Sequence, residues 1–66
     1  MHVHKADFNK LMDAGFKIYS LCIRSCVIRE LQPDMSWRVI RRRKARHKLE
    51  AEFKEILQDD RCIGAW

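Results

Sequence analysis

Cysteine and histidine are the residue types in this 66-residue chain best able to bind a metal or attack a substrate, and there are three of each. Cys22 and Cys26 stand four positions apart, which would place two metal ligands on one face of a helix. A closed zinc site needs four ligands, and neither His47 nor Cys62 stands at a ligand-like spacing from this pair. Free cysteine is among the most often buried residue types, so we expect core packing. We predict no metal and no cofactor.

Nucleophilic catalysis needs a hydroxyl or thiol beside a base and an orienting acid. None of the three serines (Ser20, Ser25 and Ser36) has a histidine at a helical neighbour position, and no glycine-rich phosphate loop is present. His2 and His4 alternate with apolar residues at the N-terminus, where disorder is more typical than a site. The sequence predicts a protein that is not an enzyme.

The number of cysteines and the hydropathy of the chain together predict a reducing compartment. Three cysteines are an odd number without the spacing of a secreted disulfide framework. The first ten residues lack the apolar core of a signal peptide. The longest apolar-rich stretch, residues 18–28, is interrupted by Arg24 and is too short to cross a bilayer. We expect reduced thiols, no membrane contact and a cytoplasmic protein.

Charge is concentrated in one segment. The chain has a net charge of +5, and residues 38–48 contain no acid but seven cations: Arg38, Arg41, Arg42, Arg43, Lys44, Arg46 and Lys48. Clustered lysine and arginine bind nucleic-acid phosphates by releasing condensed counterions. The alternative is a solvated or protein-facing helix surface, with pairs such as Arg46 and Glu50 at i, i+4. Both interpretations remain open.

The only strong break in the chain is LQPDMSW, residues 31–37. Pro33 disfavours a helical conformation at Gln32, and Asp34 and Ser36 are suitable N-caps for a new helix. We therefore predict one domain, residues 1–66, with a helix over about 5–31, a turn at 32–34, a helix over about 35–60 and a flexible tail at 61–66.

Apolar residues between positions 8 and 27 recur at spacings of three and four, which is typical of a helix face. The stretch KIYSLCIRSCVI also contains residues that favour strands. It lacks strict alternation and a recognisable hairpin turn, so we predict a helix there. Gly15 is expected to be tolerated inside this helix or to mark a close helix crossing.

The second predicted helix places six apolar residues on one stripe: Met35, Val39, Leu49, Phe53, Ile56 and Leu57. Arg42 and Arg46 fall on the same stripe, whereas Arg41, Lys44 and Lys48 share an outward flank. Two long helices joined by a short turn predict an all-α fold, an antiparallel helical hairpin. So small a domain needs help to be stable, and a second copy would complete a four-helix bundle. In layout such a dimer resembles the Rop type of plasmid RNA-binding hairpin, without a shared motif.

Two functions follow from this predicted fold. The first is a regulatory or adaptor protein that acts as a homodimer on an unidentified protein partner, by analogy an accessory protein of a phage or plasmid. Its predicted contact residues are Trp37, Ile40, Ile28, Leu31, Arg42 and Arg46. The alternative is a nucleic-acid-binding regulator that uses Arg41, Lys44, Lys48, Arg38 and Arg43. A basic leucine zipper is disfavoured because only two heptads follow the basic run.

Overall fold

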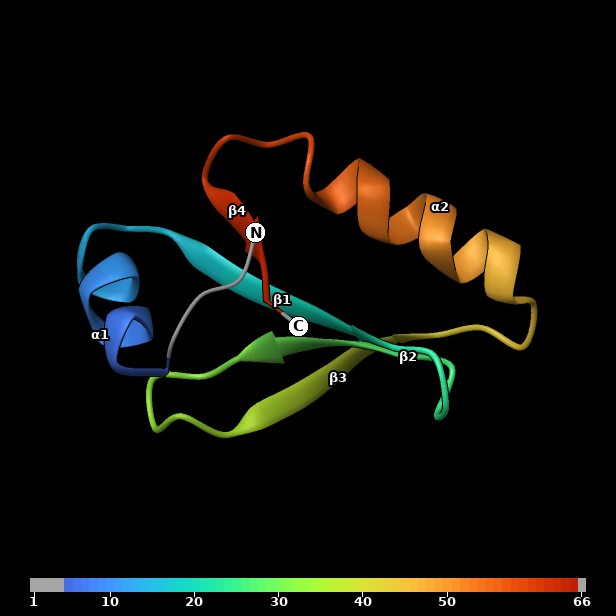
Figure 1. Ribbon diagram of the computed structural model, residues 1–66, viewed down its shortest axis with the longest axis horizontal. Coiled ribbons are helices and arrows are strands. Elements are labelled where there is room, and N and C mark those ends of the chain that lie inside the picture. Colours follow the sequence, from blue (N-terminus) through green and yellow to red (C-terminus); the bar gives the residue numbers. More distant parts are fainter. Residues whose placement is uncertain (1–4, 66) are drawn as a thin grey trace.

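The protein combines two short helices with a four-stranded sheet. The computed structural model describes residues 5–65. In chain order the elements are α1 (Lys5–Asp13), β1 (Lys17–Cys22), β2 (Val27–Leu31), β3 (Trp37–Arg42), α2 (Arg46–Ile56) and β4 (Cys62–Gly64). The sheet order is β3-β2-β1-β4, antiparallel except for the parallel pair β1–β4 (Figure 1). The predicted all-α helical hairpin and its four-helix bundle are therefore wrong, and the chain has an α/β fold.

The first predicted helix ends early because Gly15 stops it. Gly15 has φ of 93°, the left-handed conformation that favours glycine at a helix end. Its N–H donates to the Met12 carbonyl at 3.0 Å, and the Phe16 N–H donates to the Leu11 carbonyl at 3.0 Å. This pair of bonds is a Schellman motif, which closes α1 and directs the chain into β1.

The remainder of that predicted helix is a β-hairpin. A turn over residues 23–26 joins β1 to β2. Cys26 adopts φ of 55° in this turn, and its N–H donates to the Ile23 carbonyl at 3.2 Å. Helical spacing misled the prediction because these strands carry apolar residues on both faces, so they show no clean alternation.

Each face of the sheet has its own core. On one face, Phe8 of α1 packs with Ile18, Leu31 and Ala65. On the other, Leu49 and Phe53 of α2 pack with Tyr19 and Ile28. Neighbouring residues of β1 thus enter different cores, because successive side chains of a strand point to opposite faces.

The second predicted helix is also divided. Asp34 caps no helix: its Oδ1 accepts hydrogen bonds from the Ser36 N–H at 2.9 Å and the Ser36 hydroxyl at 2.6 Å. These bonds hold the pKa of Asp34 below its usual value and stabilise the β2–β3 turn. Residues 37–42 then form β3, and the helix begins only at Arg46. The tail predicted over 61–66 contains β4.

Candidate nucleic-acid interface

Two separate chain segments meet at one end of the molecule. The β1–β2 turn and the connection from β3 to α2 both lie at the right-hand end in Figure 1. A hydrogen bond joins them, since the Arg43 N–H donates to the Cys26 carbonyl at 3.1 Å. We call residues 23–26 and 41–48 the basic end.

The basic end contains no carboxylate and carries seven cations, all exposed: Arg24, Arg41, Arg42, Arg43, Lys44, Arg46 and Lys48. The fold adds Arg24 to the run because the hairpin turn lies next to the β3–α2 connection. Exposure matters here because a phosphate can reach these side chains without any displacement of the core.

Two acids of α2 balance part of this charge. Glu52 pairs with Arg43 at 3.1 Å, and Glu50 pairs with Arg46 at 3.1 Å. Pairs this exposed contribute little stability, so phosphates can compete for both arginines. The Arg41 guanidinium donates to the backbone carbonyl of the preceding residue, Ile40, at 2.8 Å. Arg41 also borders a polar cleft of about 350 Å³ that Glu52 and Glu55 line.

The other five cations of the basic end have no carboxylate within ion-pair distance among residues 5–65: Arg24, Arg41, Arg42, Lys44 and Lys48.

The start of α2 adds to the positive potential of this end. Ala45 offers no side-chain cap, and the first turn contains no acid. Amides at a helix N-terminus carry a partial positive charge, so cations beside them are unfavourable and an anion there is favourable.

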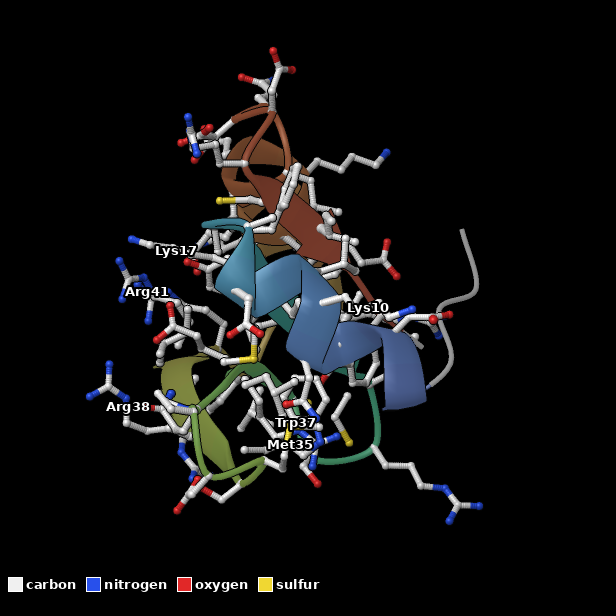
Figure 2. All side chains as sticks on the ribbon, turned by 90° about the vertical axis from the view of Figure 1, so that its left-hand side faces the viewer. Lys10, Lys17, Met35, Trp37, Arg38 and Arg41 are labelled. Atoms are coloured by element: carbon white, nitrogen blue, oxygen red, sulfur yellow. The ribbon has the colours of Figure 1, made fainter. Side chains whose placement is uncertain are left out.

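The residues predicted to bind nucleic acid are mostly brought together. Arg41, Arg43, Lys44 and Lys48 belong to the basic end. Arg38 does not, because it lies earlier on β3 and pairs with Glu30 at 3.5 Å. Figure 2 shows Arg38, Arg41 and Lys17 pointing to the same side of the molecule.

Arg24 was missed by sequence reasoning. Only recognition of a hairpin turn between two strands could have placed it beside the basic run.

The residues predicted to contact a protein partner are placed differently. Ile28 and Leu31 are core residues, 0% and 5% exposed. Ile40 is half-buried against the core under α2. Arg42 and Arg46 are exposed instead of lying on a packing stripe.

Trp37 is likewise no free surface anchor. It lies half-buried beside α1 (Figure 2), with the edge of Phe8 at a centroid distance of 6.5 Å and the Arg29 guanidinium 5.4 Å from its ring. Most of the apolar residues that were expected to be exposed, and that supported an adaptor role, are therefore buried or half-buried.

The three cysteines are free and half-buried. Within residues 5–65, no group of three or more histidine, cysteine or acidic side chains could hold a metal ion. His47 is exposed on the first turn of α2, and His2 and His4 lie outside the described residues.

The opposite end of the molecule has mixed charge. The α1–β1, β2–β3 and α2–β4 connections lie away from the basic end in Figure 1. They contain Asp34, Asp59 and Asp60 together with Arg61. Cations are thus concentrated at one end of the longest dimension of the protein, which is 33 Å.

No family model, curated protein or solved structure matches the chain. In the part of the chain that the structure describes, neither helix has the length and apolar character needed to cross a membrane.

Proposed function

We propose that the protein is a non-enzymatic nucleic-acid-binding protein that contacts phosphates through its basic end. One observation carries this proposal: two chain segments that contain no carboxylate bring seven exposed cations together at one end, where two glutamates of α2 pair with only two of them. Neutralising phosphates with lysine and arginine releases condensed counterions, which makes binding favourable in low salt. We place this activity in the cytoplasm, where free thiols such as Cys22 and Cys62 stay reduced.

The adaptor and homodimer hypotheses remain predictions, and the apolar cleft beside α2, lined by Leu21, Ile23, Phe53 and Leu57, is not made of the residues on which they were based. Their basis was surplus apolar surface, and Ile28 and Leu31 are now assigned to the core. Nucleic-acid binding needs no such surface, which is why we favour it.

Salt dependence tests the proposal directly. The full chain should bind labelled DNA or RNA of arbitrary sequence at about 50 mM salt and weaken steeply as salt rises. About four phosphates contacted would give a slope of about −3.6 on duplex DNA and about −2.8 on a single strand in a plot of log K against log salt concentration. Absence of binding to both nucleic acids at low salt would refute the proposal.

A matched pair of double variants separates position from total charge. Lys44→Gln with Lys48→Gln should make the slope less steep by about 2, since two phosphate contacts are lost. Lys10→Gln with Lys17→Gln removes the same charge from exposed positions outside the basic end and should leave the slope unchanged. Equal losses from both pairs would mean that net charge alone causes the binding.

A further inference from the structure

We infer that the basic end takes a nucleic-acid duplex and contacts phosphates on both sides of one groove. This inference rests on the proposed function and specifies the class of nucleic acid. It comes from how β3 distributes its cations over the two faces of the sheet.

Arg41 and Arg42 project to opposite faces. Arg41 is opposite Ile28, which lies in the core under α2, and it borders a cleft with residues of that helix. Arg42 is opposite Val27, the β2 neighbour of Ile28, so it points to the other face. The pairing shifts between Ile28 and Arg29, which leaves Ile40 as an extra residue in β3. A bulge of this kind bends the strand and changes the direction of the side chains that follow it.

The outer edge of β3 therefore carries positive charge on both sides. β3 is the last strand of the sheet, with no neighbour beyond it among the described residues. Because α2 covers the face that bears Arg41, the cations of its first turn add to that side. Arg42 supplies the other side, and the turn carrying Arg24 lies next to both.

A charged edge of this shape fits between two phosphate backbones. The major groove of B-form DNA is roughly 12 Å wide and admits a helix or a two-stranded β-ribbon. A single strand has one backbone, so only one side of the edge could meet it.

A single strand could make up for the missing phosphate contacts only by stacking its bases on aromatic side chains. Proteins that bind single strands combine a basic groove with aromatic platforms. Among the described residues the basic end contains no phenylalanine, tyrosine or tryptophan, and the Trp37 ring is engaged by Phe8 and Arg29.

The first experiment compares a 20-base-pair DNA duplex, the matching RNA duplex and each separate DNA strand, at equal phosphate concentration in low salt. We expect a duplex to bind at least about fivefold more tightly than either strand, because phosphates on two sides of a groove are contacted. The two duplexes identify which helical form is preferred. A smaller ratio overturns the duplex inference and leaves the proposed function standing, whereas no binding to any of the four overturns the proposed function itself.

The second experiment uses the opposed arginines. Arg41→Gln and Arg42→Gln should each make the salt slope on the preferred duplex less steep by about 1, and the double variant by about 2. Lys10→Gln is the control for lost charge at a distant exposed site. If only one of the two arginines changes the slope, a single side of the edge is used and the two-sided inference is wrong. Because both side chains are exposed, we expect both variants to fold, and circular dichroism checks this.

Discussion

At the scale of single residues, the turn that carries Arg24 also positions a thiol. Cys22 ends β1, and the pKa of its thiol is lowered by hydrogen bonding to the Ser25 side chain and backbone and by the nearby Arg29 charge. The thiolate is the nucleophilic form of cysteine. We therefore expect Ser25→Ala to slow alkylation of Cys22 by iodoacetamide near neutral pH, followed by peptide mass spectrometry. Cys62 of the same molecule is the internal control, and an unchanged Cys22 rate would count against the Ser25 contact.

Tyr19 gives a pH-dependent prediction. Burial raises its pKa above the ordinary value of 10.0, and the hydrogen bond and charge of Glu30 and the neighbouring Cys62 raise it further. Because the folded-state pKa is the higher one, this contribution to stability is complete below pH 10 and declines as pH rises beyond it. Between pH 9 and 11, the unfolding free energy of the wild type should fall more than that of Tyr19→Phe. Parallel pH profiles in urea denaturation would disprove the assignment.

At the scale of elements, the two predicted helices were wrong over most of their length, because they also covered β1, β2 and β3. α1 and α2 fall within the two predicted helices, and Pro33 does stand in a turn. The β1–β2 turn, by contrast, reads Ile-Arg-Ser-Cys and contains no glycine, proline or asparagine to mark it. The positive φ in this turn is adopted by Cys26 instead of glycine or asparagine, so the residue types gave no indication of a turn.

The sequence showed most of the cations that belong to the candidate site, but it did not show how they are arranged in space. The seven-cation run is evident in the sequence, and it contributes six of the seven cations of the basic end. Which side each cation faces depends on the strand, on the extra residue Ile40 and on tertiary pairing across β2. A helical wheel placed Arg42 on a packing stripe, whereas the strand exposes it.

A pair of truncations distinguishes the sheet from the helical hairpin. Val39 and Leu49 shared one packing stripe in the predicted helix, so the hairpin implies similar losses of stability for both. In the structure Leu49 lies on the sheet-facing side of α2 and is 1% exposed, whereas Val39 is 44% exposed. Leu49→Ala should lower the unfolding free energy by about 2–5 kcal/mol, and Val39→Ala by less than about 1 kcal/mol. Urea denaturation measures both, and comparable losses would contradict this fold.

At the scale of the whole molecule, we expect phosphate binding to depend more on where each charge lies than on the net charge of +5. Exposed charges interact mainly within a Debye length of about 10 Å at 0.1 M salt. This distance is short beside the 33 Å length of the protein. The charges of α2 therefore act on a phosphate bound at the basic end, whereas those of the α1–β1, β2–β3 and α2–β4 connections have little effect on it.

Two acidic residues test this locality with the same change in net charge. Glu55 lines the cleft that Arg41 borders, whereas Asp60 lies in the α2–β4 connection. Glu55→Gln should strengthen duplex binding by about twofold in low salt, because it removes repulsion of phosphates near Arg41. It should not destabilise α2, since an acid in the last turn of a helix is unfavourable for the dipole. Asp60→Asn should leave affinity unchanged, measured by fluorescence anisotropy at fixed salt. Equal gains from the two substitutions would show that binding follows net charge, and that charge separation along the molecule has no role.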